Sequence, residues 1–187
     1  MKMNVNDIRV GNVLEHEGRL WRVAKTMHTQ PGKGGAFMQV EMKDIVSGTK
    51  TNIRYRTAET VERAILEPKN MQFLYADGEQ LNFMDMDSYE QVTIGADVVG
   101  EQHVWLTENM DVVIEFYDGK PLGVALPETV IMEVVEADAV VKGQTQSSSF
   151  KPSKVSNGET VLVPQFVSAG ESIVINTYDG TYVERAK

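Results

Sequence analysis

The residues best suited to chemistry lie in one short stretch, where a single lysine stands among glycines and behind a proline. Proline fixes φ where the chain enters such a stretch, and glycine permits positive φ and close approach by another molecule. Because glycine has no side chain, nothing there shields the ammonium group. The pattern predicts an exposed cation on a tip loop made of Pro31, Gly32, Lys33, Gly34 and Gly35. Taken alone, the loop favours an ordinary surface lysine over a functional one.

Two catalytic or ligand-binding roles for Lys33 fit the sequence poorly. A Walker-type phosphate loop needs a glycine five residues before the Gly-Lys pair and Ser or Thr after it, but Met27 and Gly34 occupy those positions. A lysine that forms a Schiff base needs a desolvated pocket, and a glycine-rich tip is the opposite environment. We therefore expect no catalytic residues.

The sequence also offers no good metal site. His16, His28 and His103 are far apart, and none has a metal-type partner three or four residues along the chain. The acidic groups within residues 85–87 and 111–118 lack the spacing and the glycine of a calcium loop. The chain has no cysteine, which excludes disulfides and thiolate ligands and is consistent with a reducing compartment. We expect neither a metal nor another cofactor.

A long hairpin must position the tip loop. Before the loop, Trp21, Val23 and Met27 alternate with polar or small residues, and after it Met38, Val40 and Met42 do the same. Alternation with a period of two is typical of strands that bury one face. Two strands of eight to ten residues would hold the ammonium group roughly 30 Å from the base of the hairpin, at about 3.3 Å per residue.

The hairpin belongs to a small all-β unit, residues 1–64. Short strands, tight turns and no long helical pattern predict an SH3-like, KOW-type barrel for this unit. In its strand at residues 49–56, Arg54 and Arg56 share one face. They are either solvated edge residues or part of a surface that faces RNA, and the sequence favours neither.

Two further β units are expected, at residues 65–127 and 128–187, with Glu67-Pro68 marking the boundary after the first unit. Asp-Gly turns recur in both, and Ala96–Leu106 is the best helix candidate. Five-stranded barrels of the OB type are built from such pieces. In the third unit we expect strands at 130–135, continued by 137–141, then a serine-rich loop at 143–149 and strands at 161–164 and 173–176.

The charge is distributed unevenly among the three units. The 187 residues carry a net charge of −9, but residues 1–64 carry +4, residues 65–127 carry −10 and residues 128–187 carry −3. Contacts to phosphate groups need positive charge locally, whatever the total. The acidic middle unit either serves solubility or keeps the protein off random RNA. The sequence shows no signal-peptide pattern and no apolar run near the roughly 20 residues that span a bilayer.

Four segments in the same order resemble the bacterial elongation factor P family along the whole chain. They are Pro31-Gly32-Lys33-Gly34-x-Ala36-Phe37, the close of the first unit at residues 56–64, Asp85-x-x-Ser88-Tyr89-Glu90-Gln91, and a set of matches between Lys151 and Ala186. The resemblance implies an SH3-like domain and two OB domains in an L-shaped arrangement similar to tRNA.

The resemblance also implies a function. It implies a cytoplasmic, monomeric factor that enters the ribosome between the peptidyl-tRNA and exit sites and promotes peptide-bond formation at consecutive prolines. The position equivalent to the family's tip residue, which is often extended by a modifying enzyme, is Lys33. Ribosomal RNA and peptidyl-tRNA would be its partners, without a membrane. A general RNA-binding adaptor with the same barrels is the alternative.

One loop departs from the family pattern. The family often has Asp-Thr-Arg-x-Gly-x-Tyr, whereas residues 176–182 lack the arginine and include Asp179. Gly180, Tyr182 and Arg185 remain candidate RNA contacts with Arg54 and Arg56, and Tyr178 could stack on a base.

Overall fold

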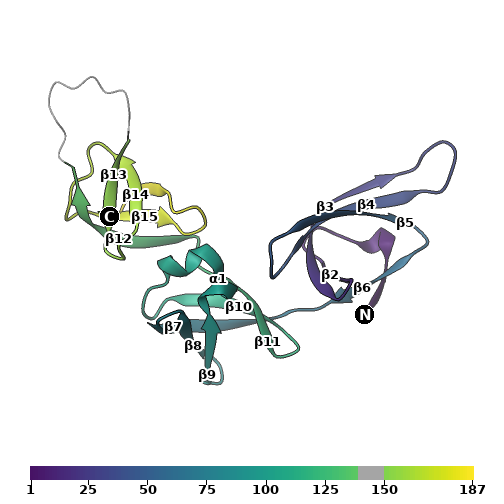
Figure 1. Ribbon diagram of the computed structural model, residues 1–187, viewed down its shortest axis with the longest axis horizontal. Helices are drawn as coiled ribbons and strands as arrows, with labels where there is room; N and C mark the ends of the chain where they lie inside the picture. The colour runs from purple at the N-terminus through teal and green to yellow at the C-terminus, as the bar shows by residue number, and fades with distance from the viewer. Residues whose placement is uncertain (139–149) are drawn as a thin grey trace. The chain divides into compact units, whose positions relative to one another are not determined.

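The computed structural model describes residues 1–138 and 150–187, and nearly all of their regular secondary structure is β-strand (Figure 1). The all-β class expected from the sequence is confirmed. The described chain divides into two compact units, the first with residues 1–69 and 114–124, the second with residues 70–113 and 125–187. No helix in the described part of the chain is long and apolar enough to cross a membrane.

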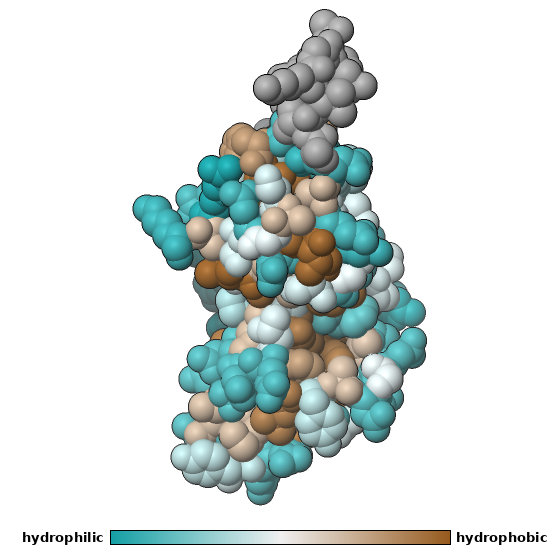
Figure 2. All heavy atoms as spheres, turned by 90° about the vertical axis from the view of Figure 1, so that its left-hand side faces the viewer, coloured by the Kyte–Doolittle hydropathy of each residue, from teal (hydrophilic) through white to brown (hydrophobic). Residues whose placement is uncertain are grey.

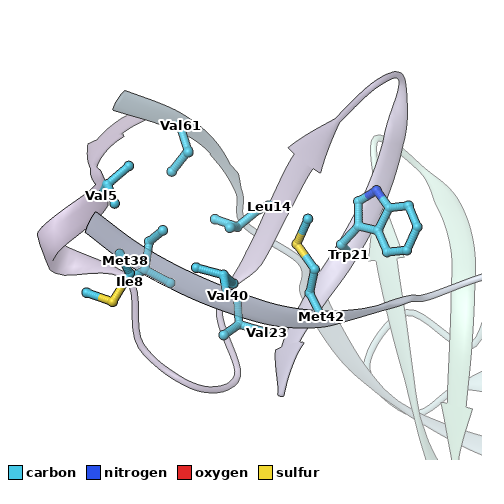
Figure 3. Packing of buried hydrophobic residues seen from close by; sticks show 9 residues of the cluster. All are labelled: Val5, Ile8, Leu14, Trp21, Val23, Met38, Val40, Met42 and Val61. Carbon is cyan, nitrogen blue, oxygen red and sulfur yellow. The ribbon is translucent and has the colours of Figure 1, made fainter. Parts of the chain in front are cut away.

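The N-terminal sheet has six strands in the order β1-β6-β2-β3-β4-β5. Their bounds are β1 Lys2–Asn4, β6 Thr60–Ala64, β2 Val13–His16, β3 Arg19–Thr29, β4 Phe37–Asp44 and β5 Lys50–Arg56, with a short 3₁₀ turn, η1, at Val5–Asp7. The sheet curves around one apolar cluster, toward which the buried side chains of several strands point (Figure 3). Its members are Val5, Ile8, Leu14, Trp21, Val23, Met38, Val40, Met42 and Val61.

The hairpin expected around the tip loop is present, but the prediction that Met27 lies on its buried face is wrong. Trp21 and Val23 are buried as expected, but the side chain of Met27 is 50% exposed. The β3–β4 register shifts between Val23 and Lys25, so that Ala24 is an extra residue on β3. Because side chains alternate strictly along a strand, one extra residue moves every later side chain to the opposite face. The partner strand keeps its pattern, and Met38, Val40 and Met42 are all buried.

The second sheet has the order β11-β10-β7-β8-β9. Its strands are β7 Glu67–Asp77, β8 Gln80–Asp85, β9 Gln91–Gly95, β10 Asp111–Tyr117 and β11 Lys120–Ala125. The helical segment expected at Ala96–Leu106 is present over residues 96–105, but not as one α-helix. Instead a four-residue α1, Ala96–Val99, precedes a 3₁₀ segment η2, Gly100–Trp105. Gly100 has a φ of +82°, a left-handed conformation that an α-helix cannot continue through.

The third sheet has the order β14-β13-β12-β15-β16. Its strands are β12 Thr129–Ala137, β13 Phe150–Val155, β14 Thr160–Pro164, β15 Ser172–Asn176 and β16 Tyr182–Arg185. The expected strands at 130–135, 161–164 and 173–176 are confirmed. The continuation expected at 137–141 falls partly, and the serine-rich loop at 143–149 wholly, outside the described residues. The sequence pattern does not single out β13, where the buried side chain of Lys151 donates a hydrogen bond to the carbonyl of Asp138.

Hydrophobic and hydrophilic residues are interspersed on the face of the molecule shown in Figure 2. Several large apolar side chains are exposed on the third sheet, among them Ile131 and Leu162. Leu162 pairs across the ladder with the exposed Pro152, and exposed apolar residues are common on protein surfaces.

Candidate nucleic-acid interface

The tip loop joins the paired residues Thr29 and Phe37 at the free end of hairpin β3–β4 (Figure 1). Lys33 and the glycines around it are exposed. A Cβ built on Gly32, Gly34 or Gly35 would meet no atom within 4 Å, and Gly34 has a φ of +112°, which favours glycine. Within residues 1–138 and 150–187, Lys33 forms no ion pair or hydrogen bond. Its ammonium group is therefore accessible to another molecule.

A cationic ledge, defined here as Phe37, Arg54 and Arg56, lies beside the tip loop. Strands β4 and β5 pair Phe37 with Arg56 and Gln39 with Arg54, so all four side chains lie on the outer face. The guanidinium of Arg54 lies 4.2 Å from the centroid of the Phe37 ring, one pair along the ladder. This cation–π contact restrains a side chain that would otherwise be free in solvent.

The cationic ledge borders a groove of about 600 Å³, which Gly35, Ala36 and residues 57–59 also line. The backbone around the groove is pinned by several hydrogen bonds. Glu59 accepts one from the amide of Arg56 through its side chain at 2.8 Å, and the amide of Thr57 donates to the carbonyl of Ala36 at 3.3 Å. The groove therefore has two exposed guanidinium groups on a fixed frame, which suits a phosphate group.

The sequence points to Arg54 and Arg56 but not to Phe37 as their support. In the sequence pattern Phe37 belongs only to the tip motif. A signal was present, because antiparallel pairing of two neighbouring strands that flank a short turn brings residues 37 and 56 opposite each other. The alternation of residues does not give the register between β4 and β5. The contact between Arg54 and Phe37 is therefore known only from the folded sheet.

Arg185, a candidate RNA contact in the second compact unit, is engaged by its own sheet. Its guanidinium lies 4.3 Å from the centroid of the Phe166 ring, donates to the Phe166 carbonyl at 3.1 Å and pairs with Glu171 at 3.4 Å. Its side chain is still half exposed. These contacts indicate that Arg185 has a structural role, since it holds β16 against the segment that follows β14.

Gly180 and Tyr182, the other two candidates, lie at the turn between β15 and β16. Gly180 has a φ of +71°, and a Cβ built there would lie 3.2 Å from Cζ2 of Trp105. Tyr182 is half buried and pairs with Ile175. Thus the structure places the five candidate RNA contacts in two groups, with Arg54 and Arg56 beside the tip loop and Gly180, Tyr182 and Arg185 in the second unit.

The turn in the second unit carries a stable negative charge. Asp179 accepts hydrogen bonds from the hydroxyl and the amide of Thr181, at 2.6 and 3.0 Å, and these lower the pKa of its carboxyl group. Tyr178 is 60% exposed beside it. A phosphate group near the turn would meet this carboxylate, and the RNA contacts expected at the turn stay a prediction. Elsewhere among the described residues, no group of three or more His, Cys, Asp or Glu side chains could hold a metal ion.

Three family models match the chain in succession. The elongation factor P KOW-like domain matches residues 4–61, the elongation factor P OB domain matches residues 66–124, and the elongation factor P C-terminal model matches residues 130–185. These matches agree with the expected SH3-like and OB folds. The boundaries at 64/65 and 127/128 stay a prediction.

Curated relatives match over the full length of both chains. The elongation factors P of Zymomonas mobilis subsp. mobilis and Rhodospirillum centenum are each 55% identical, over 186 and 187 residues, and that of Rhizorhabdus wittichii is 54% identical over 186 residues. Each alignment covers 100% of both sequences.

Solved structures share the fold at low identity. Eukaryotic translation initiation factor 5A from Methanococcus jannaschii superposes with a TM-score of 0.56 at 22% identity, covering 68% of this chain and 92% of its own. An initiation factor 5A family protein from Naegleria fowleri gives 0.55 at 14% identity, covering 67% and 95%.

Proposed function

Because the chain belongs to the elongation factor P family and is a translation elongation factor, we propose that it promotes peptide-bond formation at consecutive prolines. In this proposal it binds the ribosome between the peptidyl-tRNA and exit sites and extends Lys33 toward the end of the peptidyl-tRNA. The observation that carries the proposal is the exposed Lys33 on a glycine-rich tip, without a partner among the described residues. An amine folded against its own barrel could not act in this way.

The physical basis is positioning. Proline is a poor nucleophile and a constrained peptidyl donor, so stalling at consecutive prolines is a failure to reach the reactive geometry. A cation that contacts the terminal nucleotides of peptidyl-tRNA would hold them in that geometry. Orientation alone can remove several kcal/mol of barrier, and about 3 kcal/mol already corresponds to more than a hundredfold in rate.

The cationic ledge would supply the anchor. Two guanidinium groups beside the groove can hold the sugar–phosphate backbone while Lys33 reaches past it. Arg54 is already restrained by Phe37, so less side-chain freedom is lost when it binds. The positive charge of residues 1–64 favours the same contact, although the whole chain is acidic.

The ribosome itself forms the peptide bond, so the protein would be an accessory factor in the cytoplasm and not an enzyme. A post-translational extension of Lys33 by a modifying enzyme would lengthen its reach and needs an accessible amine. The exposure of Lys33 supports that step. The mass of the tip peptide purified from the native host tests it directly.

The decisive experiment is reconstituted translation of a reporter with three consecutive prolines. Lys33→Ala should fold normally, as shown by an unchanged unfolding transition, but should not relieve the stall. Lys33→Arg, which keeps the charge, is the matched control and should retain part of the activity. Full activity of Lys33→Ala would overturn the proposal, and binding to free single-stranded RNA as tight as to ribosomes with peptidyl-tRNA would favour a general RNA-binding adaptor.

A further inference from the structure

A second groove, of about 460 Å³, lies within the second compact unit between the 3₁₀ segment η2 and the turn after β15. We call it the indole groove. The residues that matter for its chemistry are Glu101, Trp105, Glu159, Tyr178, Asp179 and Gly180. None of them belongs to the tip loop or to the cationic ledge. A ligand bound here would therefore serve a contact separate from the action of Lys33.

Trp105 presents an unused hydrogen-bond donor to the indole groove. Its side chain is only 6% exposed, yet its indole Nε1 forms no hydrogen bond with any described residue. Nε1 is nevertheless not among the fully buried, unpartnered side-chain atoms of the described residues, so this N–H group is open to the groove and an acceptor can reach it. The other tryptophan has its partner within the chain, because Nε1 of Trp21 donates to the carbonyl of His16 at 3.2 Å. Trp105 thus lacks an acceptor within the described part of the chain.

Gly180 leaves this donor uncovered. The ring atoms of Trp105 nearest to a Cβ built on Gly180 are Cζ2 at 3.2 Å, Cε2 at 3.9 Å and Nε1 at 4.0 Å. Any side chain at position 180 would press on the edge of the indole that carries the N–H group. Since glycine has none, the backbone can lie against the ring without covering that edge.

The walls of the indole groove are anionic and aromatic. Among the described lining residues there is no lysine or arginine, and Glu101 and Glu159 form no ion pair with any described residue. Asp179 contributes a third carboxylate, and the ring of Tyr178 is 60% exposed at the rim. Exposed aromatic faces and carboxylates together attract guanidinium and ammonium groups.

We propose that the indole groove binds an arginine-bearing peptide segment of a basic protein. The main-chain carbonyl of the segment would accept the hydrogen bond from Trp105 Nε1, and the arginine would lie among the carboxylates against Tyr178. A free cation would leave the indole donor unused. An RNA phosphate could accept from the indole but would face three carboxylates, so the peptide fits both features of the groove.

The test is a titration of the full-length, ¹⁵N-labelled protein with an acetylated, amidated hexapeptide that contains two arginines among serines and glycines. The indole N–H signal of Trp105 should move and saturate, while that of Trp21, already hydrogen-bonded, should stay in place. The same hexapeptide with citrulline, which is neutral, in place of arginine should bind at least fivefold more weakly. A single-stranded RNA oligonucleotide should leave the Trp105 signal unchanged.

Charge removal completes the test. The double variant Glu101→Gln/Glu159→Gln should weaken arginine-peptide binding at least fivefold. Its matched control, Glu133→Gln/Glu184→Gln, removes two exposed carboxylates of the third sheet that do not line the groove and should change binding less than twofold. The proposal is overturned by an unmoved Trp105 signal, by equal affinity for the citrulline peptide, by equal effects of the two double variants, or by saturable binding of the RNA at this signal.

Discussion

The guanidinium of Arg54 and the ring of Phe37 stack across neighbouring strands, with 4.2 Å between Cζ and the ring centroid. Phe37 is the first residue of β4 and is separated from the tip loop by Ala36 alone, while Arg54 lies near the end of β5. The stack therefore links the strand that carries the tip to the strand that carries the basic residues. It restrains the side chain of Arg54 on the outer face of the sheet.

Loss of the aromatic ring should weaken the anchor without removing its charge. Phe37→Leu keeps an apolar side chain but abolishes the cation–π contact, which is worth about 0.5–1 kcal/mol at exposed sites. We expect a two- to fivefold loss of affinity for ribosomes with peptidyl-tRNA, measured by equilibrium binding at fixed salt. Arg54→Gln removes the charge itself and should also reduce the salt dependence of binding, by about one unit in the log–log slope. A Phe37→Leu variant that binds like the parent protein would show that the stack plays no part in the anchor.

Asp44 should make folding sensitive to acid. It is 4% exposed, and although burial raises the pKa of its carboxyl group, the amides of Ser47 and Val46 and the charge of Arg19 outweigh burial and lower it. A carboxyl group with a lowered folded pKa stabilises the fold above its unfolded pKa of about 3.8, and that contribution disappears as pH falls through the folded value.

Urea unfolding of Asp44→Asn measures this contribution. The variant should be less stable than the parent protein at pH 7 by about 1–3 kcal/mol, since hydrogen bonds to a charged group are replaced by weaker ones. The difference should shrink as the pH is lowered below about 3.8. The same substitution at the exposed Asp118 is the control and should show no such convergence. A difference that is constant from pH 7 to pH 3 would contradict the prediction.

Gly180 should resist substitution for two separable reasons. Its φ of +71° strains any residue with a Cβ by roughly 1–2 kcal/mol, and that Cβ would also press on Trp105 at 3.2 Å. Gly158 has a φ of +87°, but a Cβ built there would meet no atom within 4 Å, so Gly158→Ala reports the strain alone. Gly180→Ala should be the more destabilising of the two in urea unfolding. Equal losses would mean that the indole moves aside freely.

The bulge in β3 predicts a contrast between two methionines. Met27 is 50% exposed, whereas Met42 is fully buried in the N-terminal core. Met27→Ala should change the free energy of unfolding by no more than about 0.5 kcal/mol, and Met42→Ala should cost about 2–5 kcal/mol. Thermal or urea unfolding of both variants compares them directly. A large loss of stability in Met27→Ala would mean that the Met27 side chain is buried in the core, and would contradict the bulge at Ala24.

Much of the fold could be predicted because its signals are local. Met38, Val40 and Met42 alternate with polar residues and are buried, and Asp118-Gly119 forms a tight turn in which both residues have positive φ. The exposure of Lys33 on the tip loop could be predicted in the same way, because glycines have no side chains that could cover its amine. Two predictions failed where a single residue interrupts the regular backbone pattern. Ala24 is an extra residue in β3 and reverses the face of Met27, and Gly100, directly after α1, ends the α-helix.

By itself, the sequence determined the all-β class, the hairpin with Lys33 at its exposed tip, and the family, because each follows from residue types at short spacing. The tertiary structure decided which distant side chains meet. The stacking of Arg54 on Phe37 depends on strand register, and the contact of Gly180 with Trp105 joins residues far apart along the chain. Such contacts arise from the packing of whole sheets, and no local pattern of residues specifies them.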